Sequence, residues 1–353
     1  MSRSVSFAEV PCFYAMVEIA QDPALAGRPV LVGGDPRKRG LVQSASPEAV
    51  AAGVETEMPV MEALRLCPTA RTLRTNVRLY RETSRLLLAC MRLETGRLEP
   101  FGLGAAFFEA GAAADPVELA ARLRARVWAE LGLPLRVGIA TGKFLARLAA
   151  EDSGGAGVRQ VPPGGEEAYL APLPLTRLEG VGRKTAATLA ELGARTIGDV
   201  AALGRERLEE VFGTHGLRIH ALATARDDAP VRAARHPQSL TREVTVRGEA
   251  GDRGILLEYL TDLVRDLAEE LRRQALTAGQ VALKLRYADQ VLSTRSVALG
   301  VPTAQASELG AAAAHLLERT QAGSRAVRTI GVQVSRLAPA GEADRQLDLF
   351  PKG

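Results

Sequence analysis

The residues best suited to chemistry lie in the stretch Leu178-Glu179-Gly180-Val181-Gly182-Arg183-Lys184-Thr185-Ala186. A Gly-x-Gly step between two short helices lets the backbone approach a phosphate closely, and the N–H groups at the start of the next helix then face the anion. Lys184 and Thr185 add a cation and a hydroxyl donor to Gly180 and Gly182. This is the helix–hairpin–helix pattern of sequence-independent binding to a DNA backbone. The alternative is an ordinary turn that uses glycine to end a helix.

A second group of polar residues falls on predicted strands near the C-terminus. Lys284 and Arg286 alternate with leucines in the strand predicted at 280–287, so both cations share one face. Such a face can follow a phosphate backbone, although it can equally be a solvated sheet face. The candidate DNA contacts here are Ser239, Thr241, Arg242, Lys284, Arg286, Thr294, Arg295, Ser296 and Arg328.

The last residues carry a candidate docking peptide. Gln346 is followed by the spaced apolar residues Leu347, Leu349 and Phe350, after a tether of small residues at 338–343. An extended peptide of this kind suits a preformed pocket on a partner protein. The alternative is a segment that packs back on its own domain.

Composition and residue spacing exclude several classes. The three cysteines have no CxxC spacing and the four histidines have no ligand spacing, so a disulfide framework or zinc site is not expected. Gly33-Gly34 lacks the Lys-Ser/Thr of a phosphate loop. A net charge of +4 suits a polyanionic partner, and no apolar run approaches 18 residues. We expect a cytoplasmic, nucleoid-associated protein without a membrane span.

The elements that position these residues follow from periodicity and capping signals. A β-hairpin is expected around Gly102-Leu103-Gly104-Ala105, and residues 164–228 read as all-helical. The C-terminal region reads as strand 240–246, helix 254–274, strands 280–287 and 292–299, helix 303–320 and strand 328–336. This β-α-β-β-α-β order predicts a ferredoxin-like unit, and the whole chain an α+β multidomain protein.

Together these stretches resemble the Y-family (DinB/ImpB/MucB/SamB-type) of translesion DNA polymerases over almost the whole chain. The matching segments are Cys12–Glu18, Gly27–Gly34, Met58–Ala63, Gly138–Ala140, Lys143–Ala146, the 178–198 hairpin motif, Leu283–Asp289 and the terminal QLDLF, which looks like the family's sliding-clamp motif.

The resemblance implies a right-hand polymerase architecture. Its domains are a palm at 1–22 and 76–163, fingers at 23–75, a helical thumb with the helix–hairpin–helix at 164–230, a linker at 231–238, a ferredoxin-like little finger at 239–337, and a tail with the clamp-binding motif at 338–353.

The family's reaction uses two divalent metals, Mg²⁺ in active members, which hard carboxylate oxygens must hold. The resemblance places one carboxylate at the end of the first strand and an Asp-Glu pair at the hairpin tip. Here these positions are Glu9, Gly104 and Ala105, and Pro11 replaces a further aspartate. One carboxylate cannot substitute for three, and Glu109 lies four residues beyond the tip. No metal or other cofactor is therefore predicted.

The nucleotide pocket implied by the resemblance is altered as well. Pro47 and Val50 stand where the family has a tyrosine and an arginine that grip the triphosphate, and Ser153-Gly154-Gly155 replaces an expected lysine. Tyr14 matches the aromatic gate against ribonucleotides, but it can equally be a packing residue.

The resemblance thus implies a non-catalytic homologue similar to the ImuB-type components of bacterial mutasomes. Its expected partners are primer–template or damaged DNA, the β sliding clamp, a separate error-prone polymerase and an accessory mutasome protein. One alternative is an active but divergent translesion polymerase, of the DNA polymerase IV type, that uses Glu9 and a further acid. A second is a clamp-binding regulator that barely touches DNA.

Overall fold

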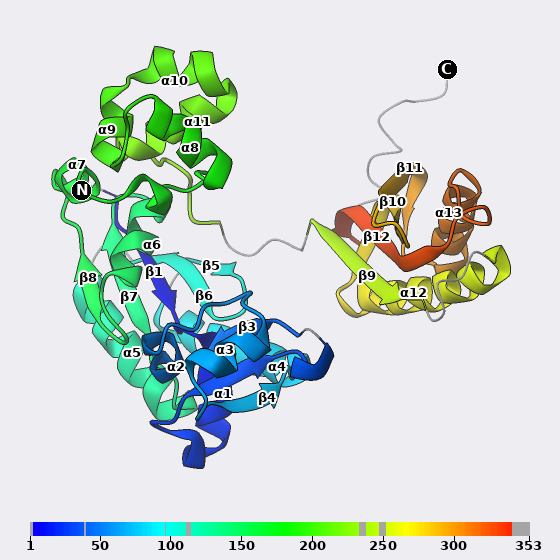
Figure 1. Cartoon of the computed structure of the whole chain (residues 1–353), viewed down its shortest axis with the longest axis horizontal. Helices are drawn as coiled ribbons and strands as arrows, with labels where there is room; N and C mark the ends of the chain where they lie inside the picture. Colours follow the sequence, from blue (N-terminus) through cyan, green and yellow to red (C-terminus); the bar gives the residue numbers. More distant parts are fainter. Residues whose placement is uncertain are drawn as a thin grey trace. The chain divides into compact units, whose positions relative to one another are not determined.

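The computed structural model describes residues 3–38, 40–95, 97–110, 114–232, 238–246 and 252–340. Its contacts divide the chain into two units, Met1–Ala234 and Arg235–Gly353, and each contains both helices and strands (Figure 1). The predicted α+β multidomain class is confirmed. Among the described residues, no helix has the length and apolar character needed to cross a membrane.

A five-stranded sheet forms the centre of the first unit. Its order is β5-β6-β1-β7-β8, with β1 antiparallel to both of its neighbours. The strands are β1 (Val5–Glu9), β5 (Arg97–Phe101), β6 (Ala105–Glu109), β7 (Arg136–Ala140) and β8 (Val158–Gln160). The predicted hairpin is the β5–β6 pair, and Gly102 in its turn has a φ of 66° that favours glycine.

Helices cover both faces of this sheet. Side chains alternate along a strand, so Val5 and Phe7 of β1 pack toward α6 (Lys143–Glu151), whereas Ala8 packs toward the other face. That other face is covered by α1 (Phe13–Gln21), α4 (Val77–Glu94) and α5 (Pro116–Leu131). Asp115 caps α5 by accepting a hydrogen bond from the Val117 N–H, and Gly132 ends the helix.

A smaller sheet of order β3-β2-β4 lies within the first unit. It comprises β2 (Val30–Gly33), β3 (Val42–Ala45) and β4 (Arg71–Arg74), with α2 (Pro47–Ala51), α3 (Val60–Leu66) and the short 3₁₀ turns η1 (Pro23–Leu25) and η2 (Pro36–Lys38) nearby in sequence. Strand β4 was not predicted because it has one apolar residue among two arginines and a threonine. It pairs with β2 at the edge of the sheet, where polar side chains remain in solvent.

The helical region begins after β8, as predicted. It comprises α7 (Glu166–Leu170), η3 (Leu175–Arg177), α8 (Arg183–Glu191), α9 (Ile197–Ala202), α10 (Arg205–Phe212) and α11 (Thr214–Ala223). Arg177 joins it to the end of α6 by contacts of 3.1 Å to Glu151 and 3.0 Å to Asp152. The Asp227 carboxylate accepts a hydrogen bond from the Phe144 N–H at the start of α6.

The second unit is an antiparallel sheet of order β11-β10-β12-β9 with two helices. The elements are β9 (Ser239–Thr245), α12 (Arg253–Arg273), β10 (Leu276–Tyr287), β11 (Leu292–Thr303), α13 (Ala306–Glu318) and β12 (Val327–Pro339). Because β12 lies between β9 and β10, the first βαβ connection is split, as the predicted element order requires. Both helices pack on the same buried face, formed by residues such as Leu283 and Val332.

Gly138 of β7 allows α6 to approach the sheet, which yields a first prediction. A Cβ atom there would lie 2.0 Å from the Ala146 carbonyl oxygen and 2.2 Å from the Ala150 nitrogen. Gly138→Ala should lower the free energy of unfolding by about 3 kcal/mol or more, because backbone rather than a side chain must move. Urea unfolding measures this. Gly300→Ala is the matched control, since a Cβ added at Gly300 would meet nothing within 4 Å; equal stability of the two variants would contradict the prediction.

Candidate catalytic and DNA-binding sites

The carboxylate of Glu9 is bound by an arginine from the neighbouring strand. Glu9 ends β1 and lies directly opposite Arg136 at the start of β7. The Arg136 Nε and Nη2 groups donate to Glu9 Oε2 at 3.0 and 2.7 Å. The Glu9 side chain is only 30% exposed and the Arg136 side chain only 20%, so solvent screens this ion pair less than it would a surface pair. The pair occupies the position at which the sequence resemblance places a metal-binding carboxylate.

The other two expected acid positions lie beside Glu9 and carry no carboxylate. Ala105 is the register partner of Glu9 on β6, and the Val10 N–H donates to the Gly104 carbonyl at 2.9 Å. A Cβ on Gly104 would lie 2.8 Å from the ring of Phe13. Phe13 therefore fills the space that a side chain at position 104 would need.

Glu109 lies at the opposite end of the same strand. It is the register partner of Val5, and its carboxylate is 3.4 Å from the guanidinium of Arg3. Four residues of extended strand span about 13 Å. The expectation that Glu109 is too far from the hairpin tip is therefore consistent with its place in the sheet.

Cys12 lies next to these groups and has a left-handed backbone with a φ of 52°. Burial is the main cause that raises the pKa of its thiol; Glu9 and Glu48 raise that pKa further, whereas Arg136 lowers it. Glu48, in the first turn of α2, has one buried carboxylate oxygen without a hydrogen-bond partner among the described residues. Within the described ranges, no group of three or more His, Cys, Asp or Glu residues is placed to hold a metal ion.

The expected nucleotide-pocket residues occupy α1 and α2. The Tyr14 ring stacks on Tyr80 with centroids 4.3 Å apart and planes at 10°, so it is engaged in packing. Tyr80 donates to Glu18 at 2.6 Å, and burial together with this bond raises the Tyr80 pKa. Pro47 is the first residue of α2 and Val50 is half exposed. Neither of these two side chains has a hydrogen-bond donor with which to hold a phosphate.

The Gly180–Thr185 loop follows the 3₁₀ turn η3, rather than an α-helix, and leads into the first turn of α8. Gly180 has a φ of 89°, Val181 is buried, and Gly182 precedes the first turn of α8 with open space around it. The first N–H groups of a helix have no partner within it and are free to bind an anion. Lys184 is exposed and Thr185 half-buried in that turn.

The first turn of α11, after a second loop between α10 and α11, contacts the first loop. His215 Nε2 lies 3.1 Å from the Gly180 carbonyl oxygen, and Arg218 pairs with Glu179. His215 is thus a structural contact of the glycine loop rather than an isolated surface residue.

In the second unit, the face of the sheet away from the helices gathers most of the predicted contacts. Register pairing places Lys284 opposite Thr294, and Arg286 opposite Thr329, on the side away from buried Leu283 and Leu285. A hollow of about 320 Å³ opens there, with Glu243 as its one acid. Ser239, Thr241 and Ser296 share this side by strand alternation.

Two predicted arginines lie elsewhere. Arg242 alternates to the helix-covered side, where it lies 3.6 Å from Glu270 of α12. Arg295 likewise alternates away from Thr294, and its Nε donates to the Arg319 carbonyl at 3.4 Å. Arg328 is exposed at the irregular start of β12. The structure thus brings Lys284 and Arg286 together but separates Arg242 and Arg295 from them.

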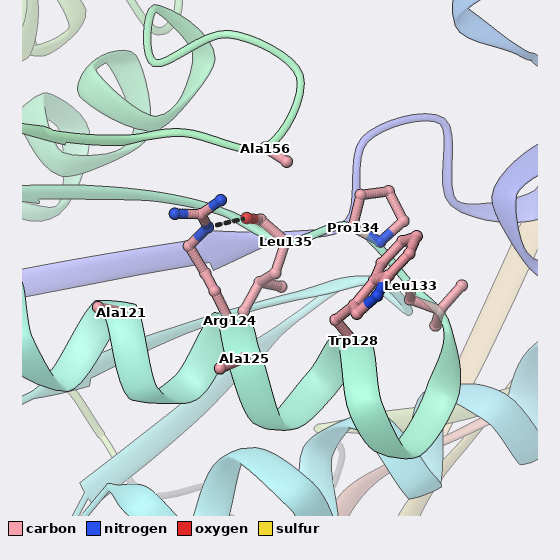
Figure 2. Close-up of a pocket in the computed structure, with 8 residues that line it drawn as sticks. All are labelled: Ala121, Arg124, Ala125, Trp128, Leu133, Pro134, Leu135 and Ala156. Carbon is pink, nitrogen blue, oxygen red and sulfur yellow. Dashed lines mark hydrogen bonds between the residues drawn. The ribbon is translucent and has the colours of Figure 1, made fainter.

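The residues Gln346, Leu347, Leu349 and Phe350 lie outside the described residues. A separate hollow of about 390 Å³ lies between α5 and the start of β7 (Figure 2). It is lined by Ala121, Arg124, Ala125, Trp128, Leu133, Pro134, Leu135 and Ala156, and Arg124 Nε donates to the Leu135 carbonyl at 3.0 Å. This lining offers neither an acid nor a nucleophile.

Sequence reasoning missed Arg136 and Phe13, the residues that define the surroundings of Glu9. The importance of both residues depends on β7 pairing with β1 and on α1 turning back over the hairpin. The only available signal was an arginine at the edge of an otherwise apolar strand.

Comparison with known proteins agrees with this architecture. Residues 9–151 match the impB/mucB/samB family, and residues 237–349 match the C-terminal domain of that family. The chain is 36% identical over 353 residues to the DNA polymerase IV of Alkalilimnicola ehrlichii, covering 99% of each protein. It is 37% identical over 352 residues to the DNA polymerase IV of Halorhodospira halophila, covering 99% of this chain and 98% of that protein.

Solved structures show the same fold. The insertion ternary complex of Dbh DNA polymerase matches with a TM-score of 0.76 at 22% identity, covering 95% of this chain and 99% of that one. DinB from Sulfolobus solfataricus matches with a TM-score of 0.71 at 21% identity, covering 94% and 98%. The two family matches and the full-length relatives together show that this chain belongs to the impB/mucB/samB family, the Y-family of DNA polymerases.

Proposed function

We propose that this chain is a non-catalytic Y-family protein that binds primer–template or damaged DNA and docks on the β sliding clamp during translesion synthesis. In this role it recruits a separate error-prone polymerase. The observation that carries the proposal is the Glu9–Arg136 ion pair beside Gly104 and Ala105.

The residues at this position do not fit a magnesium ion. Magnesium requires near-octahedral oxygen ligation, usually with one or two carboxylates from the protein. The positively charged Arg136 guanidinium is hydrogen-bonded to the carboxylate of Glu9, and Ala105 offers no side-chain oxygen. Any larger side chain at position 104 must displace Phe13. We therefore derive no metal-dependent step for this chain.

The DNA-binding part of the proposal rests on two separate surfaces. The N-terminal turn of α8 presents backbone N–H groups and Lys184. The open sheet face of the second unit presents Lys284 and Arg286. Contacts of both kinds engage phosphates without reading bases, so binding should depend steeply on salt but little on sequence.

The clamp part of the proposal rests on the sequence of the tail. Gln346 and the apolar residues Leu347, Leu349 and Phe350 suit an extended peptide in a preformed pocket. A weak peptide contact gains avidity when DNA holds both proteins together, because the effective concentration is then high.

An active polymerase is the main alternative, and the names of the relatives favour it, since those proteins are called DNA polymerase IV. It requires Glu9 to leave Arg136 and a further acid to join it. The candidate for this further acid is Glu48, which helps to raise the pKa of the Cys12 thiol and has a buried carboxylate oxygen without a hydrogen-bond partner among the described residues. The regulator with little DNA binding is less well supported, because the exposed Lys184 and Arg286 have no ion pair among the described residues.

Primer extension separates the two main candidates. With purified full-length protein on a clamp-loaded primer–template, we expect no nucleotide incorporation with Mg²⁺ or Mn²⁺, while the same sample binds the DNA. Metal-dependent incorporation that Glu9→Ala abolishes would refute the non-catalytic assignment. Incorporation that survives Glu9→Ala would indicate a contaminating polymerase.

The ion pair predicts a structural role for Glu9. Glu9→Gln should lower the free energy of unfolding by about 1–2 kcal/mol, between the values for exposed and fully buried pairs, because Arg136 loses its charged partner. DNA affinity should stay unchanged. Glu82→Gln is the matched control, since its partner Arg78 is 89% exposed. Urea unfolding of both variants measures the difference, and equal stability would argue against the role.

Charge reversal on either of the two proposed phosphate-binding surfaces should weaken DNA binding. Lys184→Glu and Lys284→Glu/Arg286→Glu should each weaken binding to DNA of any sequence, and each neutralised contact should reduce the slope of log K against log salt by about 1. Fluorescence anisotropy at several salt concentrations measures both effects. The control is Arg207→Glu, an exposed residue of α10 paired with Glu210. Unchanged slopes in both variants would contradict the assignment.

A further inference from the structure

Helix α4, labelled in Figure 1, has a sequence that contains the dipeptide Arg-Leu three times at intervals of seven residues. The copies are Arg78-Leu79, Arg85-Leu86 and Arg92-Leu93. A spacing of seven places equivalent residues on one line along a helix, with only a slow drift. The first and last arginines of the repeat lie about 21 Å apart along the helix, as do the first and last leucines.

Two leucines of the repeat, Leu86 and Leu93, lie outside the buried face of the helix, whereas Leu79 is half-buried and packs against the core. Other core contacts of α4 are made by fully buried residues, including Tyr80, Leu87 and Met91. Leu86 is 58% exposed and Leu93 is 69% exposed. Leu86 and Leu93, seven residues apart, therefore form a short apolar line that the described part of the chain leaves largely uncovered.

Positive charge borders that line. Arg78, Arg81, Arg85 and Arg92 are exposed on the same side of the helix by their spacing. Glu82 is bonded to Arg78 at 3.0 Å. The other acid of α4, Glu94, is held by Arg122 and Arg126 of α5. Within the described residues, Arg81, Arg85 and Arg92 thus have no ion pair.

Two exposed leucines one heptad apart, beside a row of like charges, suit packing against a second helix, where the flanking charges select the partner. A phosphate backbone would use the arginines but would gain little from exposed leucines. A second copy of α4 would bring arginines against arginines, because the face has one acid, Glu82, that is already paired. The complementary occupant is an apolar helix flanked by acids.

We propose that the Arg-Leu face of α4 is a docking surface for an acidic amphipathic helix of a partner protein. The proposal deepens the proposed function, on which it rests in one respect: a protein that recruits a polymerase needs a surface for a protein partner. The face itself is independent of the Glu9 site and of both DNA-binding surfaces.

The test uses a fluorescent synthetic peptide of three heptads, with leucine at positions a and d and glutamate at positions e and g. We expect it to bind the full-length protein in an anisotropy titration, whereas a matched peptide with lysine in place of glutamate does not. Leu86→Ser/Leu93→Ser and Arg85→Glu/Arg92→Glu should each weaken binding by about tenfold or more.

Helix α3 provides the matched control, because it also exposes an Arg-Leu dipeptide. Arg65 is exposed and Leu66 is 47% exposed there, outside any heptad repeat. Arg65→Glu/Leu66→Ser should bind the peptide as the parent does. An unchanged thermal midpoint would show that all variants remain folded.

Three results would overturn the proposal: no binding of the glutamate peptide, equal losses in the α3 control, or losses in DNA affinity caused by the α4 arginine variant alone. The last result would assign this face to nucleic acid. Primer extension tests the non-catalytic role separately, so that role can fail while the docking surface stands, and the reverse.

Discussion

The position of β1 at the centre of the five-stranded sheet determines the rest of the first unit. β1 is paired along both edges and covered on both faces, so its register cannot slip by one residue without exchanging its two sets of buried side chains. That constraint places Glu9 at the end of the strand, between Ala105 and Arg136. The same register sends Glu109 to the far end of β6. The chemistry available at the site is thus set by strand pairing more than by any local motif.

Most of the fold was predictable because its signals are local. The Asp115 cap, Pro116 and Gly132 mark α5 within a short stretch, and alternating leucines mark β10. Strand β4 was not predicted because an edge strand needs little apolar character. The site was predictable only in part, since the Glu9–Arg136 contact joins residues 127 positions apart and depends on which strands pair.

The second unit shows which residues of a sheet face strand periodicity alone can predict. Alternation placed Lys284 and Arg286 on one face, and pairing with β11 and β12 adds Thr294 and Thr329 to it. Alternation also removes Arg242 and Arg295 from that face, although both are adjacent in sequence to residues that remain on it. Residue type suggested one continuous basic surface, whereas the pleat divides the arginines between the two sides of the sheet.

The residue types around Glu9 are physically coupled. Three carboxylates at neighbouring positions repel one another unless a cation lies among them, and their pKa values rise when none does. Here the Arg136 guanidinium supplies the cation for Glu9. The space at position 104 is filled by an aromatic ring, so an acid would fit there only if Phe13 moved. A single acid added at position 104 or 105 would therefore place an unpaired charge beside a carboxylate that is already paired with Arg136.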